Sequence, residues 1–212
     1  YFDAAREVRS GPGALLVQAQ RDHSGIAVLY SQADMHVARL AGAVTPPSAF
    51  AGDGAWLSEH RALLRALEDL GYQYQYVAAA RIEESPQALD GYKVLFLPLA
   101  SCVSDELAAA IRAFVERGGT VVADGRVGLL TGNGTIRDPR PLDELFGVRS
   151  GAGQGAFAQA SKPSRARIGA AEVACDVLEP DLVVTTGTAF PTEDGLPASI
   201  AHAHGAGQAV LL

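Results

Sequence analysis

The sequence has 212 residues, a formal net charge of −7 and an isoelectric point near 5.2. Hydrophobic residues make up 48% of it and charged residues 19%. That composition can bury a core of domain size, which excludes global disorder. The basic residues are scattered along the chain, whereas a nucleic-acid surface needs clustered Lys and Arg. We therefore expect a folded domain with no nucleic-acid partner.

The cysteine content and the hydropathy of the sequence indicate the type of cellular compartment. Cys102 and Cys175 are too few for a disulfide framework, which favours a reducing compartment such as the cytoplasm. No apolar run reaches the roughly 18 residues of a membrane span, so we expect no membrane partner. The sequence starts at Tyr1 without a leader-like pattern, and it ends within the strand-like run QAVLL. We expect it to be part of a longer protein.

The first third of the chain predicts helices and then a strand. Residues 1–23 are typical of two short helical pieces, broken at 11–13 (GPG), where Pro removes a backbone donor and Gly favours a turn. The apolar run 26–31 (IAVLYS) is typical of a strand buried on both faces. Residues 41–55 are rich in Gly, Pro and Ala and indicate a loop.

Residues 56–98 alternate between helical and strand patterns. Apolar residues at helical spacing predict a helix over 56–70, ended by Gly71 as a C-cap. A strand follows over 72–78, and a short helix or turn over 82–89. The run 92–98 (YKVLFLP) is the strongest strand pattern in the sequence.

The next helix has the clearest signals in the chain. Ser104 supplies an N-cap, and the next two residues are acidic, which suits a helix N-terminus. One apolar stripe follows at i, i+3, i+4, i+7 and i+8, formed by Leu107, Ala110, Ile111, Phe114 and Val115. Gly118 and Gly119 end the helix, and residues 120–124 (TVVAD) form another buried strand.

This alternation predicts an α/β fold with a parallel sheet and helices on both faces. The strands over 26–31, 73–78, 92–98 and 120–124 should be parallel neighbours, because right-handed crossovers leave few alternatives. Residues 126–164 are rich in Gly, Ser and Pro. Strand-like runs at 165–178, 182–190 and 196–212 then predict a β-rich return that completes or extends the sheet.

Four stretches, taken in order, resemble one family. They are IAVLYSQADM (26–35), the long run GYKVLFLP…GGTVVADG (91–125), DELFGV (143–148) and GLPASIAHAHGAGQAVLL (195–212). Together they resemble the trimerisation domain of family-42-type β-galactosidases. Each stretch alone is weak evidence, whereas the ordered set is specific. The resemblance covers the chain from about residue 26 onward.

The resemblance implies a flavodoxin-like sheet, similar to that of class I glutamine amidotransferases. It also implies that residues 24–212 form a non-catalytic domain that helps three subunits close into a ring, while residues 1–23 are a helical linker from an upstream catalytic barrel. Carbohydrate would bind mainly to that barrel, which would hold both catalytic glutamates, so no catalytic residue transfers to this chain. A homotrimer in the bacterial cytoplasm, without a cofactor, is the corresponding expectation.

Two other functions stay open as alternatives. Amidotransferase-like enzymes hold a Cys nucleophile on a tight strand-to-helix turn, where the helix N-terminus lowers the thiol pKa. The corresponding turn here has Gly125, which has no side chain to attack a substrate. A thiol hydrolase would instead have to use Cys102 with His202 or His204. The remaining alternative is a small-molecule or sugar-binding module at the carboxyl ends of the strands.

The remaining candidate functional residues are a histidine pair and several apolar residues in irregular segments. His202 and His204 stand at i and i+2 on a predicted strand and share one face, but no third ligand is evident, so we expect no metal site. For subunit contacts the sequence offers apolar residues in the segments 41–55 and 126–164. They are Val44, Phe50, Leu129, Leu130 and Phe157. The alternative is that these residues cap the core locally.

Overall fold

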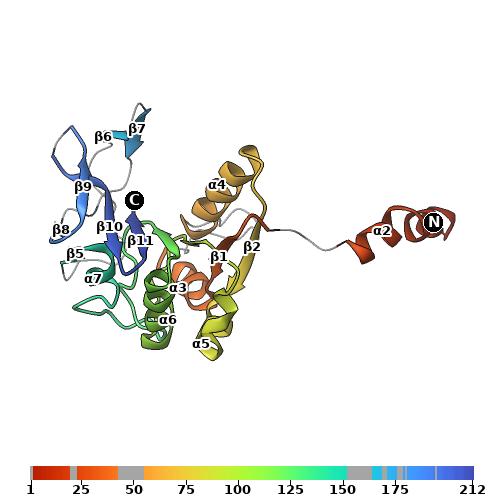
Figure 1. Ribbon diagram of the computed structural model, residues 1–212, viewed down its shortest axis with the longest axis horizontal. Coiled ribbons are helices and arrows are strands. Elements are labelled where there is room, and N and C mark those ends of the chain that lie inside the picture. Colours follow the sequence, from red (N-terminus) through yellow and green to blue (C-terminus); the bar gives the residue numbers. More distant parts are fainter. Residues whose placement is uncertain are drawn as a thin grey trace.

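The computed structural model describes residues 2–19, 23–42, 55–151, 164–168, 171–175, 179, 181–193 and 195–212. Two helices come first, α1 (Phe2–Ser10) and α2 (Pro12–Gln18), and they break at Gly11 as predicted. They lie apart from the rest of the described chain (Figure 1), and none of their residues is buried.

The centre of the molecule is a seven-stranded sheet within the described residues, with the strand order β2-β1-β3-β4-β11-β10-β9. Its strands are β1 (Ile26–Tyr30), β2 (Tyr74–Ala78), β3 (Val94–Leu97), β4 (Thr120–Ala123), β9 (Thr188–Pro191), β10 (Pro197–His204) and β11 (Gly207–Leu211). Strand β1 pairs in parallel with β2 and with β3, and β3 pairs in parallel with β4. The predicted set of four parallel neighbours is confirmed.

The C-terminal strands extend this sheet, as the β-rich pattern predicted. Strand β11 pairs in parallel with β4, whereas β10 is antiparallel to both β11 and β9. Two small antiparallel pairs stand beside it: β5 (Val148–Arg149) with β8 (Val183–Val184), and β6 (Ser164–Ile168) with β7 (Ala171–Cys175).

Helices lie on both sides of the sheet. They are α3 (Gln32–Gly42), α4 (Ala55–Asp69), α5 (Ala79–Glu84), the 3-10 helix η1 (Pro86–Leu89), α6 (Asp105–Glu116) and α7 (Asp143–Phe146). In Figure 1, α4 lies on one side of the sheet and α5 and α6 on the other. The predicted cap is present, since Ser104 Oγ accepts the Leu107 N–H at 3.1 Å.

Burial differs between the two faces, which we call the α6 face and the α4 face. Side chains alternate along each strand, so neighbours in sequence point to opposite faces. On the α6 face, Leu95 and Val121 are fully buried in the largest core cluster, together with residues of α6 and α7. On the α4 face, Phe96 and Val122 are only half-buried. The main core is therefore on the α6 face.

The turn between β10 and β11 packs directly onto the end of α6. A Cβ atom at Gly207 would lie 2.2 Å from the Gly119 carbonyl oxygen, and one at Gly205 would lie 2.7 Å from Glu116 Cα. The Ala206 N–H donates to the Glu116 carbonyl at 3.2 Å. Backbone meets backbone here, which explains the glycines at both ends of this contact.

Candidate functional site at the carboxyl edge of the sheet

In doubly wound sheets a ligand usually binds outside the carboxyl ends of the strands, where the strand order reverses. Here that point lies between β1 and β3, and Asp34 from the first turn of α3 occupies it. Its Oδ1 accepts the Cys102 N–H at 2.6 Å, and its own N–H donates to Ser31 Oγ at 3.1 Å. Asp34 is 3% exposed. A side chain therefore fills the place that a ligand would take.

The Cys102 thiol lies in the same filled region. It is buried and packs with Leu129, Leu130 and the apolar side of α3. Burial, followed by the nearby Asp34 carboxylate, raises the pKa of the Cys102 thiol to about 12. The thiolate is the nucleophilic form, so this thiol is poorly suited to attack a substrate at neutral pH.

The structure does not bring Cys102 to either imidazole. Both histidines are on β10, and β4 and β11 separate β10 from β3, so roughly 14 Å of sheet lies between them. The His202 Nδ1–H donates to the Leu145 carbonyl at 2.9 Å, and its Nε2 lies 3.1 Å from Thr186 Oγ1. His204 Nε2 lies 3.7 Å from a Glu116 carboxylate oxygen.

The turn after β4, expected to carry the remains of a nucleophile elbow, has two unusual features. The positive φ of 67° belongs to Arg126 and not to Gly125. After this turn the described chain continues in turns and bridges as far as α7 (Asp143–Phe146). No helix N-terminus therefore lies directly after Gly125, although that dipole is what lowers a thiol pKa in an elbow.

An ion pair that sequence reasoning missed holds this turn in place. Arg140 and Glu179 form a two-pronged contact, with nitrogen–oxygen distances of 2.8 and 3.1 Å, and both side chains are largely buried. A Glu179 carboxylate oxygen also accepts the Arg126 N–H at 3.0 Å. This contact fixes the strained Arg126 backbone.

Carboxylates gather beside the filled crevice. Both oxygens of Asp124 lie within 2.8 Å of the Leu99 N–H, which steadies Leu99 at a φ of 43°. Burial, with smaller contributions from Glu59 and Asp34, raises the pKa of Asp124 to about 7. Burial likewise raises the pKa of Asp34 to about 6. Within the described residues, no group of three or more possible ligands is placed to hold a metal ion.

Aromatic rings cluster next to these carboxylates. The Trp56 and His60 ring centroids lie 3.9 Å apart, and Tyr30 makes edge contacts at 6.3 Å with both Trp56 and Tyr76. His60 is buried, and its Nδ1–H donates to the Trp56 carbonyl at 2.8 Å, which leaves Nε2 without a partner in the described structure. Burial lowers the pKa of His60, which favours its neutral form.

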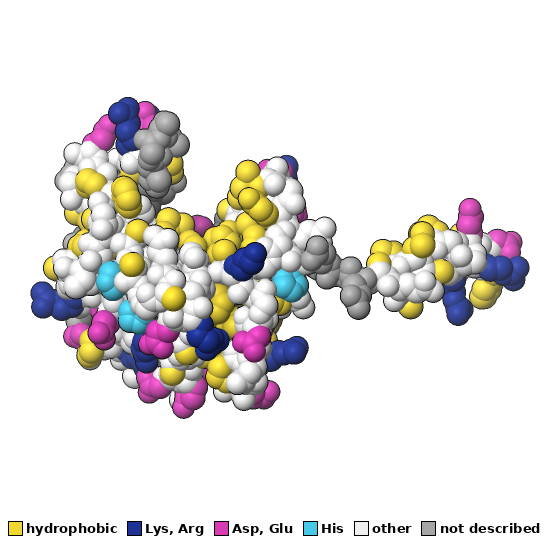
Figure 2. Space-filling model, in the orientation of Figure 1, with side chains coloured by type: hydrophobic (Ala, Val, Ile, Leu, Met, Phe, Trp, Pro, Cys, Tyr) yellow, Lys and Arg dark blue, Asp and Glu magenta, His cyan; other side chains and the backbone are white. Residues whose placement is uncertain are grey.

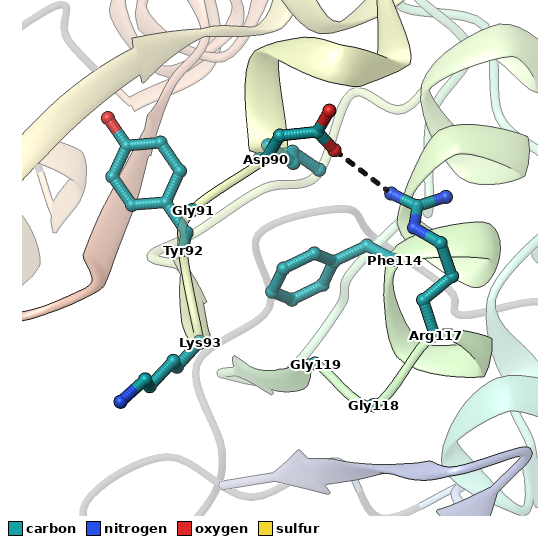
Figure 3. Close-up of a pocket in the computed structure, with 9 residues that line it drawn as sticks. Asp90, Gly91, Tyr92, Lys93, Phe114, Arg117, Gly118 and Gly119 are labelled. Carbon is teal, nitrogen blue, oxygen red and sulfur yellow. Dashed lines mark ion pairs between the residues drawn. The ribbon is translucent and has the colours of Figure 1, made fainter.

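A shallow pocket of about 300 Å³ opens at the opposite, amino edge of β3 and β4 (Figure 3). Its cations are Lys93 and Arg117, and Arg117 lies 3.9 Å from the Asp90 carboxylate. The Tyr92 hydroxyl donates to Gln75 at 3.0 Å. The remaining lining is largely glycine backbone and apolar side chains. The pocket holds no nucleophile paired with a base.

The proposed subunit-contact residues have mixed outcomes. Leu129 and Leu130 are 2% and 3% exposed, so the alternative that they cap the core locally holds, and the subunit-contact alternative does not. They pack under α3 because their loop folds back onto it. Val44, Phe50 and Phe157 lie outside the described residues.

The geometry defines a doubly wound α/β domain whose ligand crevice is filled by its own side chains. A family model described as the β-galactosidase trimerisation domain matches residues 74–212. The chain belongs to this family. No helix in the described part of the chain is long and apolar enough to cross a membrane.

Solved structures agree in fold. The β-galactosidase of Bacillus circulans sp. alkalophilus superimposes with a TM-score of 0.77 at 17% identity, over 100% of this chain and 32% of that one. Gan42B, a GH42 β-galactosidase from G. stearothermophilus, gives 0.72 at 18% identity, over 98% and 30%. The chain thus spans about a third of the length of these relatives.

One curated relative gives a shorter match. The β-galactosidase BglY of Alicyclobacillus acidocaldarius is 38% identical over 68 residues, which is 31% of this chain and 10% of that protein.

Proposed function

We propose that this chain is the assembly domain of a larger glycoside hydrolase of the β-galactosidase type, and that it joins three subunits into a ring. The observation that carries the proposal is the family match over residues 74–212. The chain corresponds to about a third of the solved β-galactosidases that share its fold. The remaining part would contain the catalytic domain.

A non-catalytic role is consistent with the carboxyl edge of the sheet. Asp34 fills the usual ligand position, and the nearby Cys102 thiol has a raised pKa. His202 hydrogen-bonds within the fold to Leu145 and Thr186, and His204 lies 3.7 Å from the Glu116 carboxylate. These groups act as structural contacts, which leaves the chemistry to residues of another domain.

We further propose that residues 1–23 connect the assembly domain, residues 24–212, to an upstream catalytic domain. The apolar side chains of α1 and α2 support this arrangement, since Phe2 is 89% exposed and Val17 is 88% exposed. Such side chains are normally covered by a partner. Carbohydrate would bind mainly to the upstream domain, and the parent protein would act in the cytoplasm.

Sedimentation equilibrium of the full-length protein tests the assembly role. We expect the mass of a trimer at micromolar concentration, and a monomer there would contradict the proposal. The chain of residues 1–212 alone, assayed with an aryl β-galactoside and with glutamine, should show no turnover above buffer. Hydrolysis of either substrate would show that the domain is catalytic.

A further inference from the structure

The α4 face of the sheet is open where a parallel sheet is normally covered. Parallel sheets bury both faces under helices. Most of the described residues of β3, β4 and β11 on this face are apolar but only half-buried, whereas their neighbours on the α6 face are fully buried. The half-buried members are Val94, Phe96, Val122 and Val210.

The reason lies in the order of the elements. Helix α4 covers β1 and β2 by packing Leu63, Leu64 and Leu67 against Ile26 and Val28. Val94 and Phe96 of β3 lie at the edge of this cluster and stay half-buried. After β4 the described chain runs through loops and antiparallel strands, and none of its described helices crosses this face next to α4. Figure 2 shows hydrophobic side chains along the floor of the notch between α4 and the β6–β7 hairpin.

Two aromatic side chains also stay exposed on the α4 face, at the carboxyl ends of β1 and β2, where their rings contact Trp56 and His60 of α4. Tyr30 and Tyr76 share the α4 face, because β1 pairs with β2 in register at Val28 and Tyr76. Their exposed fractions are 37% and 42%. Strand β2 is also an edge strand within the described sheet. Tyr and Trp are the residues most enriched at the centres of protein interfaces.

We propose that the open α4 face, made of Val94, Phe96, Val122 and Val210 with Tyr30 and Tyr76 at its margin, is where a second copy of this protein docks. The inference rests on the proposed function, because family membership in a trimerisation domain is what makes the partner a second copy. A closed three-fold ring needs a patch that meets a different patch on its neighbour. An apolar floor with an aromatic margin suits such a contact.

Charge insertion in the full-length protein tests this assignment. Tyr76→Lys places an ammonium group on the docking surface, and we expect its trimer dissociation constant to rise at least tenfold in sedimentation velocity. Phe190→Lys is the matched control, because Phe190 is 41% exposed and lies on β9 at the opposite end of the sheet. That control should remain trimeric.

A second variant tests the centre of the face without adding charge. Val122→Thr keeps the shape of the side chain and adds one hydroxyl, so it should weaken the trimer while the isolated chain keeps its melting temperature. A trimer unaffected by Tyr76→Lys and Val122→Thr but dissociated by Phe190→Lys would overturn the inference and leave the trimerisation role standing. A wild-type protein that is already monomeric would instead refute the proposed function.

Discussion

The two faces of the sheet have similar sequences and different surroundings. Strand β3 reads VLFL and β4 reads TVVA, so alternate residues on both faces are mostly apolar. On the α6 face these residues are fully buried, and on the α4 face they are half-buried. An apolar strand pattern thus indicates that a face of the sheet has to be buried. It does not indicate whether the residues that bury it belong to the same chain.

The α6 face is sealed by contacts that tie distant segments together. The β10–β11 turn packs its backbone on the end of α6, and Arg112 of α6 donates to the Pro141 carbonyl at 2.6 Å. The Arg140–Glu179 pair fixes the loop that follows β4. On the α4 face, Val94 and Phe96 of β3 pack only at the edge of the Leu67 cluster, and Val122 and Val210 belong to no core cluster of the described residues. Substitutions on each face can test this difference.

The largest effect is expected where backbone meets backbone on the sealed side. Gly207→Ala would place a methyl group about 2.2 Å from the Gly119 carbonyl oxygen and 2.3 Å from that of Val115. The turn would have to separate from α6, at a cost of about 4 kcal/mol or more. Gly132→Ala is the control, because its Cβ would meet only Ser104 at 3.8 Å. Urea unfolding should find the control near wild type and Gly207→Ala mostly unfolded.

The next largest effect concerns the buried ion pair. Glu179→Gln leaves the Arg140 guanidinium buried without its counter-charge, which costs about 3 kcal/mol. Arg165 and Glu172 form an exposed pair at 2.6 Å, so Glu172→Gln is a matched control with an expected loss below about 1 kcal/mol. Chemical denaturation compares the two. Equal losses would show that the Arg140 pair does not hold the sealed side together.

A pH dependence should arise at the carboxyl edge. The folded pKa of Asp34, about 6, exceeds its ordinary value of 3.8, so between these values the folded state holds a proton that the unfolded state has released. This contribution to stability is therefore full below about pH 4, falls as pH rises to about 6, and stays lost above it. The loss amounts to about 2–3 kcal/mol.

Asp34→Asn isolates this contribution, because its amide oxygen can still accept the Cys102 N–H. The free energy of unfolding of the variant should decline less between pH 4 and pH 7 than that of the wild type. Parallel profiles for the two proteins would show that Asp34 does not hold its proton in the folded state.

Most of the fold could be predicted because its signals are local. The strands of the parallel half are continuous apolar runs, and α6 has a Ser104 cap, an apolar stripe and a glycine stop within a short stretch. The doubly wound order follows from alternation and crossover handedness. These features need no knowledge of which distant residues meet.

The details of the candidate site could not be predicted, because they depend on distant pairs. Asp34 and Cys102 are 68 residues apart, and Arg140 and Glu179 are 39 apart. Neither separation along the sequence corresponds to a recognisable motif. Leu130 could not be placed for the same reason, since an apolar residue in an irregular loop can face solvent or fold back onto the core.

The smallest expected effect gives the most direct comparison of burial on the two faces. Val121 and Val122 are adjacent on β4, where Val121 is fully buried on the α6 face and Val122 is half-buried on the α4 face. Their strand propensity is the same, so Val→Ala at each position differs only in what the side chain packs against. In the isolated chain we expect a loss of about 2–3 kcal/mol at Val121 and about 1 kcal/mol at Val122. In the full-length trimer a docked subunit would cover Val122, so its cost should rise toward that of Val121, as measured by urea unfolding at fixed protein concentration. A gap that stays the same in both proteins would mean that no subunit covers the α4 face.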